Sequence, residues 1–159
     1  MELAGSCRCG SVRFTVAAYA PVPYMRCYCS ICRKTAGGGG YAINLGAKAD
    51  TLKILSGEGS IQVYRAVIDG EPSPLERRFC KLCGSALWAW DPRWPDLVHP
   101  FASAIDTPLP RPPSNTHIML DFAAPWVKIA AGPGDEQFPR YPDKSLADWH
   151  RAHGWPNEE

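Results

Sequence analysis

Seven cysteines in three tight groups constrain this 159-residue chain more than any other feature of its sequence. The groups hold two, three and two residues: Cys7 and Cys9; Cys27, Cys29 and Cys32; Cys80 and Cys83. An odd number does not pair fully into disulfides, and the first ten residues are too polar for a signal peptide. Buried free thiols would not cluster so tightly. The pattern predicts zinc sites, since zinc accepts a tetrahedron of soft thiolates without redox chemistry.

The spacing within each group indicates how its sulfurs are presented. The last pair encloses two residues and precedes Gly84, a zinc-knuckle pattern in which a tight turn points both sulfurs inward. The first pair lies before an alternating segment, so an extended backbone would point both sulfurs to one face. The middle trio would supply three ligands and leave one coordination position open. Spacing alone leaves a second partition open, with Cys7, Cys9, Cys27 and Cys29 on one ion and Cys32, Cys80 and Cys83 on the other.

Composition and periodicity favour a β-rich fold of packed antiparallel sheets. Sixteen prolines and fourteen glycines leave little room for long helices. Strands are expected at residues 10–16, 41–45, 52–55, 61–68, 75–79, 86–90, 98–105, 117–122 and 126–129. Residues 33–35 allow one helical turn, and only the C-terminal segment predicts a short helix, with Ser145 as its cap, residues 146–153 as its body and Gly154 as its stop.

Length and charge bound the remaining possibilities. The chain is expected to form a single domain over residues 1–159, with a core at about 3–130 and a C-terminal extension at 131–159. A formal net charge of +1 provides no basic excess for nucleic acid or anionic membranes. No run of about 18 apolar residues would span a bilayer. We therefore expect a cytoplasmic protein that binds neither nucleic acid nor membrane.

Basic residues and histidines near the cysteine groups are candidates for the site. Four basic residues lie nearest in sequence, namely Arg33, Lys34, Arg77 and Arg78. Charged residues on short strands and turns are mostly solvated, so each is expected at the surface rather than against a substrate. His117 opens an apolar strand, where a place in the site is the less favoured interpretation. His150 and His153 are expected on the surface of the terminal helix.

The residues around the cysteines also resemble a known family. Segments 5–14, 27–34 and 79–84 read GSCRCGSVRF, CYCSICRK and FCKLCG. They are similar, with every cysteine included, to the glutathione-dependent formaldehyde-activating enzyme family, which also contains centromere-protein-V-like members. The similarity continues through residues 106–117, 124–126 and 141–143.

This resemblance implies a mainly β, Mss4-like fold in which small antiparallel sheets surround zinc. It implies that Cys7, Cys9, Cys80 and Cys83 form a structural site and that Cys27, Cys29 and Cys32 form a catalytic one. Two zinc ions per chain are then expected. The implied reaction is the reversible addition of glutathione to formaldehyde, which in reverse cleaves the carbon–sulfur bond of S-hydroxymethylglutathione. The expected function is a carbon–sulfur lyase or synthase with glutathione or its adduct as partner.

Two other functions stay open from the sequence. One is a zinc-stabilised interaction module without catalysis, and the other is an enzyme of the same fold that acts on another small electrophile without glutathione. The middle trio disfavours the first alternative, because a binding module needs only the structural four. Residues 37–40 and 91–100 depart from the family pattern, and both are candidates for the border of a pocket.

Overall fold

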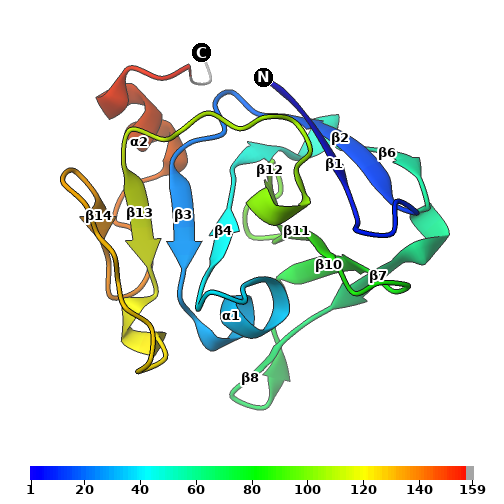
Figure 1. Ribbon diagram of the computed structural model, residues 1–159, viewed down its shortest axis with the longest axis horizontal. Coiled ribbons are helices and arrows are strands. Elements are labelled where there is room, and N and C mark those ends of the chain that lie inside the picture. The colour runs from blue at the N-terminus through cyan, green and yellow to red at the C-terminus, as the bar shows by residue number, and fades with distance from the viewer. Residues whose placement is uncertain (157–159) are drawn as a thin grey trace.

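The computed structural model describes residues 1–156, which form small β-sheets with two short α-helices (Figure 1). The predominance of antiparallel strands and the short C-terminal helix confirm the mainly β fold expected from the sequence. Strands of two to five residues are usual here, since prolines and glycines break the chain so often. Sheets this small bury little surface individually, so the fold depends on contacts between them.

A three-stranded sheet carries the first cysteine pair. Its antiparallel strands, in the order β1-β2-β6, are β1 (Glu2–Ser6), β2 (Arg13–Ala17) and β6 (Lys53–Ser56). Alternation along the hairpin sends Leu3, Phe14 and Val16 into the core, where all three are buried. The turn between β1 and β2 holds Cys7 and Cys9, so this pair lies in a turn and not in the extended backbone that the spacing suggested.

A five-stranded antiparallel sheet carries the last cysteine pair. In spatial order its strands are β5 (Ala47–Lys48), β12 (Leu97–Pro100), β11 (Ala86–Trp90), β10 (Glu76–Cys80) and β7 (Ile61–Tyr64). β10 ends at Cys80, and the turn that follows contains Cys83. Phe14 of the first sheet packs edge-on against Trp88 of this one, with ring centroids 4.9 Å apart. The two sheets thus share one apolar core.

A four-stranded sheet positions the middle trio. Its order is β14 (Glu136–Gln137), β13 (Asn115–Ile118), β3 (Tyr24–Cys27) and β4 (Ala42–Asn44). β13 runs parallel to both β3 and β14, whereas β3 and β4 are antiparallel. The parallel pairs join segments about 90 and 20 residues apart in the chain, and local alternation reveals neither pairing. A separate hairpin is formed by β8 (Val67–Ile68) and β9 (Glu71–Pro72).

Two α-helices complete the fold, and neither is long and apolar enough to cross a membrane within the described residues. α1 (Ser30–Ala36) is longer than the single turn expected at residues 33–35. α2 (Leu146–His153) confirms the prediction: the Ser145 hydroxyl accepts from the Asp148 N–H at 3.1 Å, and Gly154 ends the helix in the left-handed conformation. The expectation that His150 lies on the helix surface is wrong, because its side chain is buried and its Nε2 lies 2.6 Å from the carbonyl oxygen of Val22.

Several predicted strands have different ends in the structure. The segment 61–68 divides into β7 and β8, and residues 126–129 form no strand. The segments 98–105 and 117–122 stop early, because each runs into a single-turn 3₁₀ helix. The four such helices among residues 1–156 are η1 (Ala49–Thr51), η2 (Glu58–Ser60), η3 (Ala102–Ala104) and η4 (Leu120–Phe122). Met119 ends β13 by adopting a left-handed φ of 60°.

The capping box of α2 predicts a stability effect. Ser145→Ala removes the oxygen that satisfies a helix N–H, so the free energy of unfolding should fall by about 1 kcal/mol. Ser145→Asn is the matched control, because asparagine caps as well as serine, and it should stay within about 0.5 kcal/mol of the parent. Urea unfolding measures the free energy of unfolding of both variants. Equal losses in the two variants would contradict the capping role.

Candidate functional site

The first candidate centre joins turns from two different sheets. Its members, called the four-cysteine group below, are Cys7, Cys9, Cys80 and Cys83. Their sulfurs all lie within 4.8 Å of one another, so one metal ion can contact all four. The two turns are also joined by the Arg8 N–H, which donates to the Ser85 hydroxyl oxygen at 3.0 Å. All seven cysteines of the chain are free thiols, so the structure pairs none of them as a disulfide.

Hydrogen bonds favour the thiolate form of the exposed members of this group. Ser85, through its hydroxyl and backbone, holds the pKa of Cys83 down to about 5. The side chain and backbone of Ser11 likewise lower the pKa of Cys9. Burial instead raises the pKa of Cys80 to about 11. A cation at the centre would favour deprotonation of this buried thiol, because a nearby positive charge stabilises the thiolate.

The second candidate centre comes from one short segment. Cys27 ends β3, Cys29 caps α1 and Cys32 lies in the first turn of α1, and we call them the three-cysteine group. Their sulfurs also lie within 4.8 Å of one another. The Cys32 N–H donates to the Cys29 sulfur at 3.3 Å, so the start of the helix itself fixes the spacing. Figure 1 shows this segment at the lower ends of β3 and β4.

The three thiols of this group hold their protons unequally. Hydrogen bonds from Cys27 and Cys32 lower the pKa of Cys29 well below its usual range. Hydrogen bonding to Cys29 and Cys32, together with burial, raises the pKa of Cys27. Cys29 is also the most exposed of the three, since Cys27 and Cys32 are buried. Deprotonation is therefore favoured at Cys29 and disfavoured at Cys27, and a bound metal ion would favour the thiolate at both.

Arg77 is the basic residue that contacts this group, contrary to its expected place at the surface. Its side chain extends from β10, the residue is 9% exposed, and both Nη atoms lie 3.5 Å from the sulfur of Cys32. Arg78, the next residue, makes an ion pair with Glu76 and is partly exposed, as expected. Lys34 is also exposed. Burial decides the difference, because successive residues of a strand point to opposite faces of the sheet.

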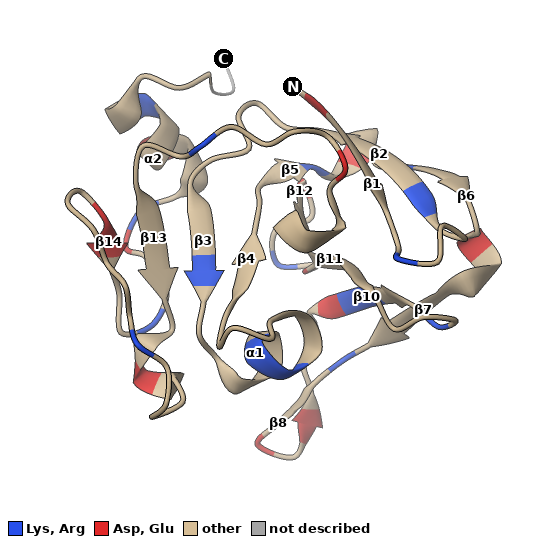
Figure 2. Ribbon diagram, viewed as in Figure 1, with Lys and Arg blue, Asp and Glu red and all other residues tan. Residues whose placement is uncertain are grey.

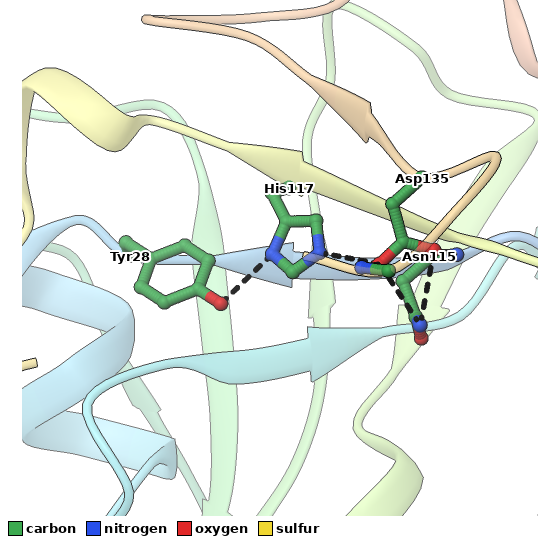
Figure 3. Close-up of polar contacts among 5 residues, drawn as sticks. Tyr28, Asn115, His117 and Asp135 are labelled. Atoms are coloured by element: carbon green, nitrogen blue, oxygen red, sulfur yellow. Dashed lines mark hydrogen bonds and ion pairs between the residues drawn. The ribbon is translucent and has the colours of Figure 1, made fainter. Parts of the chain in front are cut away.

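A buried chain of hydrogen bonds leads from the three-cysteine group into the four-stranded sheet (Figure 3). The Tyr28 hydroxyl lies 2.9 Å from Nδ1 of His117, and Nε2 of His117 lies 3.0 Å from Oδ2 of Asp135. His117 is fully buried, and its ring stacks on that of Tyr28. Tyr28 lies between Cys27 and Cys29 in the sequence. The hydrogen bonds from Tyr28 through His117 therefore hold the backbone between these two cysteines against β13.

Asp135 is the last member of this series of hydrogen bonds, and it lies in a loop that the sequence analysis did not identify as part of a site. Its carboxylate accepts the backbone N–H groups of Asn115 at 2.7 Å and Gly132 at 3.0 Å. Burial by itself would raise its pKa, but these bonds and the contact with His117 hold it well below its usual range. A Gly132-Pro133-Gly134-Asp135 turn is the one local signal, and it points to a turn rather than to a site.

A cavity of about 430 Å³ lies between the four-cysteine group and the end of α1. Its lining includes Cys7, Arg8, Thr35, Ala36 and Ser103. Neither residues 37–40 nor residues 91–100 line this cavity, although both were candidates for a pocket border. Ala36 packs against the cluster that contains Cys27 and Cys32, so one wall of the cavity backs onto the three-cysteine group.

The low pKa of Asp135 predicts how stability changes with pH. A carboxylate whose folded pKa is depressed stabilises the fold above its unfolded pKa of about 3.9 and loses this contribution as pH falls. Asp135→Asn should therefore cost about 1–3 kcal/mol at pH 7, and the difference from the parent should shrink below about pH 4. Asp121→Asn, which alters an exposed carboxylate, is the control and should change stability little at any pH. Denaturant unfolding from pH 7 to pH 3 measures the difference; a constant gap would contradict it.

Comparisons with known proteins agree with this geometry. The family model described as glutathione-dependent formaldehyde-activating enzyme matches residues 2–120. A Halomonas elongata protein, whose given name proposes the same activity, is 58% identical over 154 residues that cover 97% of this chain and 98% of the relative. The crystal structure of a Rhodobacter sphaeroides protein is similar in fold, with a TM-score of 0.53 and 24% identity over 70% of this chain and 93% of the other. The chain therefore belongs to the glutathione-dependent formaldehyde-activating enzyme family.

Proposed function

We propose that this protein is a zinc-dependent carbon–sulfur lyase or synthase that acts on a glutathione adduct such as S-hydroxymethylglutathione. The observation that carries the proposal is the unequal size of the two sulfur groups, one of four and one of three. Four thiolates saturate a tetrahedral ion, whereas three leave a position for a substrate atom. Family membership supplies glutathione and formaldehyde as the chemistry to be tested.

We assign a structural zinc to the four-cysteine group. Tetrahedral zinc with bonds of about 2.3 Å would separate its sulfurs by roughly 3.8 Å. The sulfurs of Cys9 and Cys80 are 3.9 Å apart, near that separation, and those of Cys7 and Cys9 are somewhat closer, at 3.4 Å. An ion here would cross-link two turns that the chain separates by 71 residues. Its role would be to hold the three-stranded and five-stranded sheets together.

We assign the catalytic centre to the three-cysteine group. Cys27, Cys29 and Cys32 would hold a zinc ion, which would supply a Lewis acid, and three protein ligands would leave room for a substrate atom. The protein contributes the low-pKa thiolate of Cys29, the buried sulfurs of Cys27 and Cys32, and a backbone fixed through Tyr28. The start of α1 positions Cys29 relative to Cys32, because the Cys32 backbone N–H donates to the Cys29 sulfur.

The proposed reaction balances without a further reactant. In synthesis, the glutathione sulfur bonds to the carbonyl carbon of formaldehyde, and the thiol proton ends on the carbonyl oxygen. In lysis, the same carbon–sulfur bond breaks and the proton returns to sulfur. No electron is gained or lost, so a redox-inactive ion suits the site. The residues of the three-cysteine group have only to bind and orient, which agrees with their position at the end of β3 and the start of α1.

A metal-content comparison tests the assignment of the two roles. Cys80→Ser should lose the structural ion and most of the stability, because the turns that it joins come apart. Cys29→Ser should stay folded, keep one tightly bound zinc per chain and lose activity. Elemental analysis and thermal unfolding of both variants provide the readout. If the two variants lose zinc and stability to the same extent, the assignment is wrong.

Thiol dependence tests the reaction itself. Exchange between free formaldehyde and its glutathione adduct, followed by exchange NMR, should accelerate at least about tenfold over the uncatalysed rate with the parent and not with Cys29→Ser. Turnover of formaldehyde or another electrophile without any thiol would favour the same-fold enzyme that needs no glutathione. Absence of turnover with two ions bound would favour the interaction module, for which the four-cysteine group suffices.

A further inference from the structure

We propose that Arg77 is a positioning residue that offsets the charge of the three-cysteine centre and so allows it to bind an anionic sulfur ligand. The inference rests on the proposed function, because it concerns the metal-loaded form of that site. Beyond that function, the inference identifies the fourth ligand of the metal ion at the three-cysteine group as an anionic sulfur and Arg77 as the side chain that favours it. Arg77 acts through Cys32, whose sulfur it contacts, and not through the substrate itself.

Arg77 occupies an interior position of the five-stranded sheet. It lies on β10, paired with Ala89 of β11 on one side and Tyr64 of β7 on the other. Figure 2 shows acidic and basic positions side by side on this strand. The acidic neighbour, Glu76, forms ion pairs with Arg65 and Arg78. Within residues 1–156, the hydrogen-bond acceptor that faces the guanidinium of Arg77 is the sulfur of Cys32.

A buried guanidinium needs an anionic partner. Removing a guanidinium from water is costly unless a negative charge compensates. The two contacts at 3.5 Å make the sulfur of Cys32 that partner, and the sulfur would become anionic on binding a metal ion. The sequence places an arginine at a position where an apolar residue would pack at lower cost. The arginine is therefore suited to the site rather than to the core.

The charge balance of the centre explains why an arginine is useful there. A divalent ion with three thiolates carries one net negative charge, which would repel an incoming thiolate in a poorly solvated site. Arg77 neutralises that charge. Its N–H groups also draw electron density from the Cys32 sulfur, so that a bound ion remains a better acceptor for a fourth ligand.

The four-cysteine group shows the contrast. Among the described residues, no arginine or lysine side chain donates to its sulfurs, which instead contact serine hydroxyls and backbone N–H groups. Its members Cys9 and Cys83 are exposed, so water screens the excess negative charge. A saturated site has no need to admit another anion. A guanidinium thus accompanies the one group that leaves a coordination position for a ligand.

The experiment compares an anionic with a neutral ligand at a cobalt-substituted centre. Arg77→Met, Arg77→Lys and Arg77→Gln are loaded with cobalt, and the visible spectrum is titrated with 2-mercaptoethanol, which binds as a thiolate, and with imidazole, which is neutral. Arg77→Met should weaken thiolate binding at least about tenfold and change imidazole binding less than about twofold. Arg77→Lys should restore thiolate binding to within about threefold of the parent. Arg78→Met is the matched control and should behave like the parent, since its partner Glu76 keeps Arg65.

Several results would overturn the proposal. If Arg77→Met weakens the binding of thiolate and imidazole to the same extent, the arginine does not select charge. The same conclusion follows if the affinity for both ligands is unchanged. If Arg77→Met fails to retain cobalt at the three-cysteine group, the test compares Arg77→Lys, which keeps the positive charge, with Arg77→Gln, which removes it. Equal thiolate affinity in these two variants would overturn the proposal. This readout needs no turnover. A parent that discriminates thiolate from imidazole through Arg77 but does not exchange formaldehyde with glutathione would refute the proposed function and leave the role of Arg77 intact.

Discussion

Convergence of cysteine sulfurs from distant parts of the chain is the constraint on which this structure depends. The β1–β2 turn and the β10–β11 turn belong to different sheets, yet four sulfurs meet where the turns touch. Strands of two to five residues bury too little surface to hold such sheets in register by themselves. The core shared around Phe14 and Trp88 joins the two sheets by apolar packing, and the proposed structural zinc would add a cross-link at the four-cysteine group.

The three-cysteine group is organised differently, since its spacing is local and its surroundings are not. One strand end and one helix start bring its sulfurs together, whereas β10 supplies Arg77 and β13 supplies His117. These surroundings act on different parts of the group. The positively charged guanidinium of Arg77 contacts the sulfur of Cys32. The hydrogen bond between His117 and Tyr28 holds the backbone between Cys27 and Cys29. A centre that must admit a ligand keeps its geometry only if the residues behind it are fixed.

These differences connect structure to function. Four sulfurs with two exposed members are suited to holding sheets together around a saturated ion, and three buried sulfurs beside a guanidinium are suited to a site that would bind an anionic sulfur. Glutathione is a thiol, and its adduct with formaldehyde is broken at a carbon–sulfur bond. The family to which the chain belongs is named for glutathione-dependent activation of formaldehyde, so the geometry and the relatives support the same proposal from separate observations.

Local patterns were sufficient for whatever depends on neighbours in the chain. Cysteine spacing indicated the two kinds of site, and Ser145 with Gly154 delimited α2, because turns and helix caps are decided within a few residues. Only the tertiary structure determined which cysteine pairs meet, that β13 lies parallel to β3, and that Arg77 and His150 are buried instead of solvated. The physical reason is that burial and pairing depend on which segments the fold places side by side. An arginine followed by another arginine on one strand looks the same in sequence, and the sheet alone decides which of them faces a sulfur and which faces water.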